Sequence, residues 1–333
     1  MIKFGLQMVP AYAAGADAVA HFNEQIALVR AARDAGFASV WVAQHFVAAP
    51  LQYLQTVPTL GRVAAEAGHM TIGPCVLLLP LNHPVRVAEE FATLDIITGG
   101  RLILGVGAGY NEREMTALGI DPRTRLGRYT EFLRVLPRLW SGEAVTSEGR
   151  HFPLEDVQLT LRPVQRPHPP IWIGAQGDAA IRRAAQLGDS WIAPPGGPTE
   201  LSRRMGIYRA ARVETGRPLP EELPARIDVF LAETNRQALD DARACLEATD
   251  QAFAQWGLAR VSPDKETAGK SYEEWARERL IVGDPDYCLD RLAAYRAAGN
   301  NHFILRVYFP GINPDHAHRS IRLLGTHVLP NVK

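Results

Sequence analysis

A histidine and a set of alternating glycines are the residues of this chain whose types and positions point most directly to chemistry. His45 stands beside Gln44 at the end of a predicted strand, where an imidazole either acts as a general acid or base or serves as a structural side chain. Gly105, Gly107 and Gly109 end another predicted strand. They either let a flat ligand approach the backbone closely or are imposed by packing.

A second small-residue turn, Ala175-Gln176-Gly177, joins a predicted strand to a predicted helix. Backbone amides at the start of a helix attract anions, and late strands of α/β barrels often supply a phosphate site. The alternative is an ordinary strand-to-helix turn with Asp178 as the N-cap.

Several other kinds of site are disfavoured by the motifs. The glycine stretch fails as a dinucleotide fingerprint, because Tyr110 stands where the third glycine is due. No nucleophile elbow, cysteine pair or HExxH motif is present, which argues against acyl transfer and zinc hydrolysis. His316 and His318 begin a predicted helix without convergent ligands, so no metal site is predicted, and His83 before Pro84 is interpreted as a capping or packing residue.

The elements that must position these residues alternate regularly along the chain. The hydrophobic pattern predicts strands at residues 3–9, 39–45, 71–79, 102–107, 170–175, 190–193, 226–232 and 302–309, with helices between them. This predicts one domain, residues 1–333, folded as an eight-stranded (β/α) barrel. Two insertions interrupt it, a short hairpin within residues 141–169 and a polar, irregular segment at 258–282.

Function in such barrels lies at the carboxyl ends of the strands. The polar, aromatic and glycine-rich residues there are Gln7, Gln44 to Phe46, Asn82 and His83, Gly107 to Tyr110, Ala175 to Gly177, Trp191 to Pro195, and Arg306.

Composition bears on which binding partners and which cellular compartment are expected for the protein. The 333 residues include 36 Lys plus Arg and 36 Asp plus Glu, so no net field recruits nucleic acid or an anionic membrane. Three scattered cysteines predict a reducing, cytoplasmic setting, and no apolar run is long enough to span a bilayer. The N-terminal segment is interpreted as a first strand rather than a signal peptide.

The chain resembles the bacterial-luciferase-like flavin- and deazaflavin-dependent oxidoreductases over nearly its whole length. The resemblance is carried by WVAQHF at residues 41–46, by the segment from LPLNHP to GVGAGYN at 79–111, by PIWIGAQGDAAIRRAAQLGDSW at 170–191, and by GDPDYCLDRLAAYRAAG at 283–299. It implies a (β/α)₈ barrel with a flavin ring across its mouth.

The resemblance also implies roles for individual residues. His45 corresponds to the family's active-site histidine, and Gln44 is expected to hydrogen-bond the ring or the substrate. Cys75-Val76 falls where relatives carry a cis non-prolyl peptide that supports the ring. The other residues expected to bind the cofactor are Gln7 and Trp191 at strand ends, Gly107, Ala108 and Gly109 along the ring and ribityl chain, and Ala175, Gln176 and Gly177 at the phosphate.

Two departures bear on the activity. Gln44 and Phe46 flank His45 where luciferases place a glutamate and a second histidine, which removes a charge that could tune the histidine. Ala108 stands where luciferase has an arginine on the flavin phosphate. Both departures argue against light-emitting aldehyde oxidation. Deazaflavin-using relatives often carry aspartate in place of Gln44, so the chain does not match that subgroup cleanly either.

The first functional hypothesis is a monooxygenase that uses reduced FMN from a separate flavin reductase, molecular oxygen and a small organic substrate. The second is a deazaflavin-dependent hydride-transfer oxidoreductase, whose cofactor tail needs a cationic groove; Arg113, Arg123, Arg125 and Arg128 lie near enough in sequence to supply one. The third is a flavin-binding protein without catalysis. A homodimer is expected from the resemblance.

Overall fold

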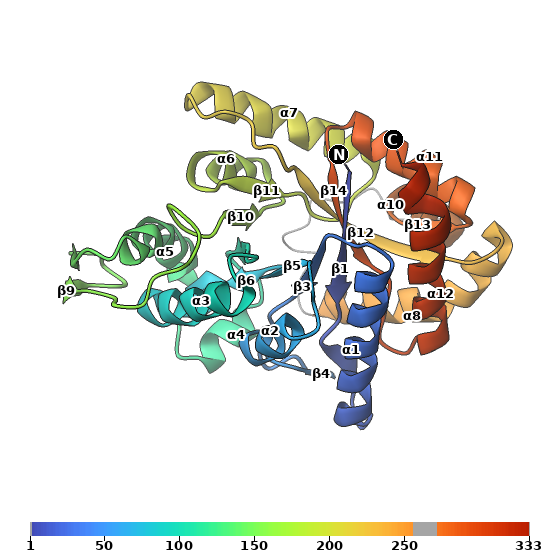
Figure 1. Cartoon of the computed structure of the whole chain (residues 1–333), viewed down its shortest axis with the longest axis horizontal. Helices are drawn as coiled ribbons and strands as arrows, with labels where there is room; N and C mark the ends of the chain where they lie inside the picture. The colour runs from blue at the N-terminus through green and yellow to red at the C-terminus, as the bar shows by residue number, and fades with distance from the viewer. Residues whose placement is uncertain (1, 256–271, 333) are drawn as a thin grey trace.

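Eight parallel strands follow one another around a ring in the computed structural model, which describes residues 2–255 and 272–332 (Figure 1). One sheet has the order β13-β12-β14-β1-β3-β5, and a second has the order β11-β10-β7-β6. Parallel bridges of Ile72 with Leu102 and of Ala193 with Ala225 join the two sheets at both ends. The predicted eight-stranded (β/α) barrel is therefore confirmed.

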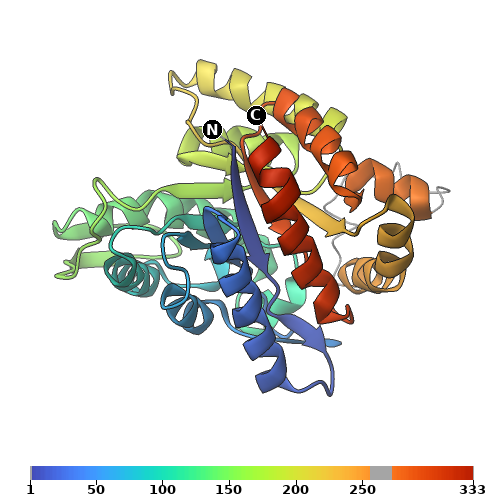
Figure 2. The ribbon, with the colours of Figure 1, turned by 45° about the vertical axis from the view of Figure 1, so that its right-hand side comes forward.

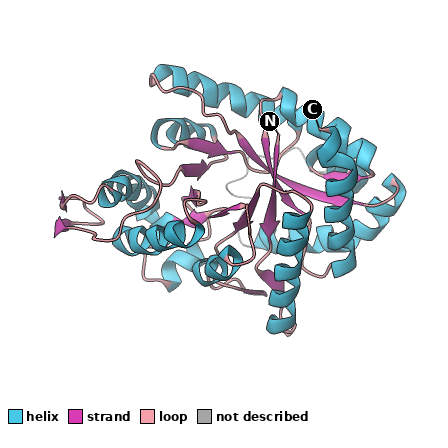
Figure 3. Cartoon of the chain, viewed as in Figure 1, coloured by secondary structure: helices cyan, strands magenta, loops and turns pink. Residues whose placement is uncertain are grey.

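The strands of the ring are β1 (Lys3–Met8), β3 (Ser39–Val42), β5 (Thr71–Pro74) continued by β6 (Leu77–Leu78), β7 (Leu104–Gly107), β10 (Ile171–Gly174), β11 (Ser190–Ile192), β12 (Pro224–Leu231) and β14 (His302–Arg306). Helices cover the outside of the ring (Figures 2 and 3). They are α1 (Ala18–Asp34), α2 (Thr56–Ala64), α3 (Pro84–Thr98), α4 (Glu112–Ala117), α5 (Arg125–Trp140), α6 (Asp178–Leu187), α7 (Pro198–Glu214), α8 (Asn235–Gln255), α10 (Tyr272–Arg279), α11 (Pro285–Ala297) and α12 (Pro314–Leu323).

Helix α3 illustrates how local sequence sets these elements. Pro84 occupies its first turn, where a missing amide hydrogen costs nothing. The His83 side chain accepts a hydrogen bond from the backbone N–H of Val85, so its predicted capping role is confirmed. Gly99 ends the helix with φ of 62°, a left-handed conformation that glycine adopts without strain.

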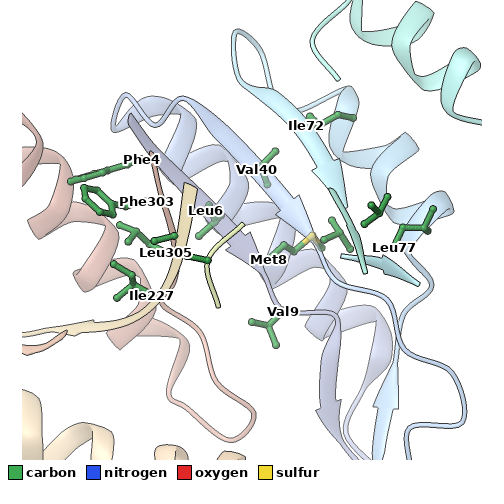
Figure 4. Packing of buried hydrophobic residues seen from close by; sticks show 14 of the residues in the cluster. Phe4, Leu6, Met8, Val9, Val40, Ile72, Leu77, Ile227, Phe303 and Leu305 are labelled. Carbon is green, nitrogen blue, oxygen red and sulfur yellow. The ribbon is translucent and has the colours of Figure 1, made fainter. Parts of the chain in front are cut away.

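Strand alternation separates two cores. On β1, Phe4, Leu6 and Met8 face the helices and join the larger core (Figure 4), while Gln7 faces the barrel interior. The smaller core fills the barrel itself and consists of Trp41, Cys75, Ile103, Trp172, Ile192 and Ile304. Trp41 and Trp172 stack in it with ring centroids 5.3 Å apart. This packed interior confines any ligand to the barrel mouth.

The two insertions differ from each other. Residues 141–169 contain the predicted hairpin, β8 (Val145–Ser147) paired antiparallel with β9 (Leu154–Val157). The prediction of an irregular segment at 258–282 is wrong for its described part, because α10 and the strand β13 (Ile281–Gly283) are regular, and β13 pairs with β12. Most residues of α10 are charged, but Ala276 within it and Leu280 directly after it are buried. Residues 258–271 lie outside the described part.

Sequence reasoning also missed a short antiparallel pair at the barrel mouth, β2 (Ala11–Ala13) with β4 (Leu51–Tyr53). Among the helices of residues 2–255 and 272–332, none combines the length and apolar character needed to cross a bilayer.

Candidate active site

A cavity of about 550 Å³ opens at the carboxyl ends of the strands, a size typical of small-molecule and cofactor sites. Most of the residues predicted for the site line it: Gln7, Gln44, His45, Cys75, Val76, Gly107, Ala108, Gly109, Ala175, Gln176 and Gly177. Trp191 is the exception, because it is buried behind the wall, where its Nε1 donates a 2.8 Å hydrogen bond to the carbonyl of Ala175.

His45 is held by a carboxylate that sequence reasoning missed. Its Nδ1 lies 2.6 Å from Oε1 of Glu114, which is nearly fully buried on α4. Asn111 donates to the same oxygen at 3.2 Å, and Gln55 donates to the backbone carbonyl of His45 at 3.1 Å. A carboxylate on Nδ1 fixes the ring orientation and leaves Nε2 as the nitrogen for proton transfer.

Gln44 and Phe46, which flank His45 in the sequence, bring no charge to it. Glu114 supplies the negative charge from 69 residues away. The sequence signal was ambiguous, because Asn111 followed by Glu114 matches the spacing of a helix capping box. Asn111 does cap α4, but its partner glutamate turns to the histidine instead of the backbone.

Two tyrosines flank the imidazole edge-on. The ring centroids of Tyr53 and Tyr110 lie 5.4 Å and 6.0 Å from that of His45, and both side chains line the cavity. Burial raises the pKa of Tyr53 and of Tyr110 well above the ordinary value. Both therefore remain neutral hydroxyls that can donate hydrogen bonds.

Gln44 lines the cavity beside His45, but its amide oxygen is used within the protein. The backbone N–H of Leu78 donates to this oxygen at 2.9 Å, and Asn82 lies at 3.4 Å from it. Gln44 therefore fixes the backbone of β6, next to the Cys75-Val76 peptide.

The wall beneath the cavity is built from the Cys75-Val76 peptide and two glycines. The peptide is cis, as the resemblance predicted. A Cβ on Gly107 would lie 2.6 Å from Cγ2 of Val76, and one on Gly174 would lie 2.9 Å from its Cγ1. These glycines therefore make room for the Val76 side chain, and Gly109 is required by its φ of 69°. Packing against Val76 therefore accounts for Gly107, while the alternative that the glycines let a flat ligand approach the backbone stays a prediction.

The turn after β10 leads directly into helix α6 at the edge of the cavity. Gly177 is the N-cap of α6 and makes no side-chain capping bond, while Asp178 pairs with Arg203 on the next helix. The alternative that Asp178 caps α6 is therefore wrong. Arg183, one turn into the helix, also lines the cavity.

Of the four arginines expected to form a cationic groove, only Arg125 lines the cavity, where it donates to the carbonyl of Gly109 at 2.8 Å. Arg128 donates to the carbonyl of Pro80, and Arg123 pairs with Asp121. Arg113 is exposed on α4.

A second charged group, which sequence reasoning did not assemble, stands on β12 and β14. Arg226 and Arg306 both bind Asp228, and all three line the cavity. Burial acts to raise the pKa of Asp228, but the two guanidinium groups overcome it and hold the pKa below its usual value. Burial lowers the pKa of Arg306 to about 10.

Neither a reactive thiol nor a metal centre is found here. Burial raises the pKa of Cys75 to about 12, which keeps it protonated. His316 and His318 pair with Asp241 and Glu24, and the described part of the chain holds no cluster of three His, Cys, Asp or Glu side chains suited to a metal.

Known proteins resemble this chain in both sequence and fold. A family model described as luciferase-like monooxygenase matches residues 2–302. The F420-dependent glucose-6-phosphate dehydrogenase of Microbacterium testaceum is 29% identical over 330 residues, covering 93% of this chain and 94% of the relative. Monooxygenase RslO1 from Streptomyces bottropensis superposes with a TM-score of 0.86 at 26% identity, over 100% of both chains. The oxygenating constituent of 3,6-diketocamphane monooxygenase from Pseudomonas putida, in complex with FMN, has a TM-score of 0.84 at 21% identity, over 100% of this chain and 99% of that one, and shows the likeness of fold alone.

Proposed function

Because this chain belongs to the luciferase-like monooxygenase family and is an oxidoreductase, we propose that it oxidises a small organic substrate with reduced FMN and molecular oxygen. Reduced FMN, supplied by a separate flavin reductase, provides the electrons that activate oxygen. The protein supplies orientation, proton transfer and exclusion of water. The proposal includes the homodimer expected from the resemblance.

The observation that carries a flavin-type cofactor is the wall at Cys75-Val76. Val76 sits on Gly107 and Gly174, and the three residues leave a smooth apolar surface on which a flat ring can lie. The amides of Ala175 to Gly177, with Arg125 and Arg183 nearby, suit the phosphate. The residues therefore fit FMN.

His45 is the proposed acid and base. Glu114 holds its Nδ1–H, so Nε2 is the atom that takes up or releases a proton. The neutral hydroxyls of Tyr53 and Tyr110 beside it are proposed as hydrogen-bond donors to the ligand, and the amide nitrogen of Gln44 as a donor to ring or substrate.

FMN is preferred because three of the four arginines expected to bind a long anionic tail, Arg113, Arg123 and Arg128, do not line the cavity. The neighbour RslO1, itself a monooxygenase at 26% identity, supports the same preference.

The second candidate is hydride transfer with a deazaflavin. It is favoured by the full-length relative that is named F420-dependent and is 29% identical. Titration of the purified protein with FMN and with deazaflavin, followed by absorbance, separates the two. Tight binding of FMN with oxygen-dependent turnover of its reduced form supports the proposal; binding of deazaflavin alone overturns it.

The third hypothesis, binding without catalysis, is tested with His45→Ala. The oxidation of reduced FMN should slow in this variant while FMN affinity is retained. His69→Ala is the control, because His69 is exposed and contacts only the backbone carbonyl of Phe37 among the hydrogen bonds described. If His45→Ala oxidises reduced FMN at the native rate, His45 has no catalytic role.

A further inference from the structure

Two side chains at the mouth of the barrel bridge from β12 to the wall on which the cofactor is proposed to lie. Nε of Arg226 donates to Oε1 of Gln7 at 2.8 Å, and Nε2 of Gln7 donates to the carbonyl oxygen of Cys75 at 3.3 Å. Gln7 is 6% exposed and Cys75 7%, and all three residues line the cavity. This arrangement, the Arg226–Gln7 bridge, ends at the first residue of the Cys75-Val76 peptide.

The members of the bridge come from alternate strands of the ring. In the order β12-β14-β1-β3-β5, Arg226 stands on β12, Gln7 on β1, and Cys75 directly follows β5. Side chains that alternate strands send inward meet in one layer of a barrel. The fourth strand of this set is β10, where a Cβ on Gly174 would lie 2.9 Å from Cγ1 of Val76. The bridge and the Val76 side chain therefore occupy the same layer.

The chemistry of the bonded groups fixes the orientation of the Gln7 amide. A guanidinium only donates hydrogen bonds and a carbonyl oxygen only accepts them, whereas a glutamine amide does both. Both bonds form when the Gln7 oxygen faces Arg226 and the Gln7 nitrogen faces Cys75. A reversed amide would set donor against donor and oxygen against oxygen, and both bonds would be lost. Arg226 therefore decides which end of Gln7 faces the wall.

Arg226 is itself held by a second hydrogen bond, from a different nitrogen. Its Nη2 donates to Oδ1 of Asp228 at 2.7 Å, and Asp228 also accepts two bonds from Arg306 on β14. The side chains of Arg226 and Asp228 are 18% and 8% exposed. A planar guanidinium that is bound at two positions loses little further freedom when it orients Gln7.

From this geometry we propose that Arg226 is a positioning residue for the cofactor. By orienting Gln7 it holds the Cys75 carbonyl, and with it the wall that Val76 presents to the ring. The cofactor part of this inference rests on the proposed function, whereas the orientation of Gln7 does not. Arg226 needs no contact with ring or substrate for this role, so a residue on β12 controls FMN affinity at a wall that follows β5.

Substitutions of Gln7 test the bond to the wall, with FMN affinity measured by fluorescence titration. Gln7→Glu keeps an oxygen that accepts from Arg226 but loses the N–H that donates to Cys75. Gln7→Met removes both bonds at a similar side-chain volume. Each variant should bind FMN about fivefold to tenfold more weakly, as for a lost buried hydrogen bond. Native affinity in either variant overturns the proposal.

Arg226→Met tests whether Arg226 acts through Gln7. It should weaken FMN binding by the same factor as Gln7→Met, and the double variant should show no further loss. Additive losses overturn the proposal. Arg236→Met and Gln237→Met are the matched controls and should bind FMN normally, because both residues are exposed at the start of α8.

A conservative variant covers the case in which Arg226→Met fails to fold. Arg226→Lys keeps a positive charge for Asp228 but has one nitrogen where the guanidinium uses two. An ammonium forms its stronger hydrogen bond with the carboxylate, so Gln7 loses its partner. Arg226→Lys should therefore weaken FMN binding as Arg226→Met does, and native affinity in a folded Arg226→Lys overturns the proposal.

A second measurement follows Gln7 itself and needs no cofactor. In protein labelled with ¹⁵N-glutamine, the side-chain NH₂ resonances of Gln7 are assigned by their absence from Gln7→Met. They should shift or broaden in Arg226→Met and in Arg226→Lys, because the amide no longer has a single orientation, and stay in place in Arg236→Met. If Arg226 only served to bind Asp228, these resonances would not move. Unchanged Gln7 resonances overturn the proposal even if FMN binding weakens.

Failure of this inference is distinct from failure of the proposed function. If FMN does not bind the native protein but the Gln7 resonances depend on Arg226, the orientation of Gln7 by Arg226 is supported and the cofactor assignment falls. If FMN binds and its reduced form reacts with oxygen while the Gln7 and Arg226 variants keep native affinity, the positioning role falls alone.

Discussion

Replacing Glu114 with glutamine tests whether the buried carboxylate acts through His45. The substitution keeps the size of the side chain and the acceptor oxygen that Asn111 contacts, and removes only the charge. The 2.6 Å contact with Nδ1 of His45 then changes from a charge-assisted hydrogen bond to a neutral one. Its consequence should appear in proton transfer at His45 rather than in cofactor binding.

The expected magnitude follows from the burial of the pair. The Glu114 side chain is 2% exposed and that of His45 13%, so solvent screens the interaction little. A hydrogen bond to a charged group contributes about 1.5–3 kcal/mol, which corresponds to roughly a tenfold to hundredfold change in rate. We therefore expect Glu114→Gln to slow oxygen-dependent oxidation of reduced FMN by that factor.

The assay is a double-mutant cycle on this rate, with FMN affinity measured for each variant. His45→Ala and the double variant should react equally slowly, because Glu114 has no effect once its partner is gone. Glu112→Gln, on the exposed side of the same helix, should match the native enzyme. The reasoning is refuted if Glu114→Gln slows the His45→Ala background by the same factor as the native one.

Three further predictions concern the wall, the barrel base and the thiols. Gly107→Ala should abolish FMN binding, because the new Cβ would lie 2.6 Å from Cγ2 of Val76. The control is Gly206→Ala on α7, whose new Cβ has no atom within 4 Å and which should bind FMN normally in the same titration. Burial would raise the pKa of Glu222, yet His302 and Lys3 hold it at about 2 instead of 4.5, so the stability it confers is present above pH 4.5 and lost as the pH falls toward 2. In Glu222→Gln, the free energy of unfolding measured in urea should lose roughly 1–2 kcal/mol of its change between pH 4.5 and 2, after allowance for the partial exposure of Glu222. A pH dependence equal to that of the native protein would contradict this. Burial raises the pKa of Cys75 to about 12 and of Cys245 to about 11, so iodoacetamide at neutral pH should label these thiols only in urea, as read by mass spectrometry.

Local pattern was sufficient for most of the fold. Apolar periodicity, helix-starting prolines and helix-ending glycines are properties of adjacent residues, and they located all eight strands of the ring and helices such as α3 and α5. The failures were α10, whose charged residues obscure the buried Ala276, and two sets of three-residue strands, β13 and the β2–β4 pair, which are too short for periodicity to register.

The same local reasoning placed the cavity wall, because residues at strand ends meet wherever parallel strands close into a ring. His45, Val76, Gly107 and Ala175 line one cavity for this reason. The cis geometry of Cys75-Val76 came from the resemblance, and the structure confirms it.

Only the tertiary structure decided which charges meet. Glu114 reaches His45 across 69 residues, and Arg226 reaches Gln7 across 219. The contacts among β1, β12 and β14 depend on the register of strands that are distant in sequence, such as Lys3 opposite His302 and Asp228 opposite Arg306. A shift of one residue in either pairing would turn these side chains to the other face of the sheet, so composition and local spacing carry no information about them. The sequence alone therefore determined a barrel with a cavity at its mouth, and the closure of the ring determined the partner of the histidine and the pairing of Arg226 and Arg306 with Asp228 at the cavity.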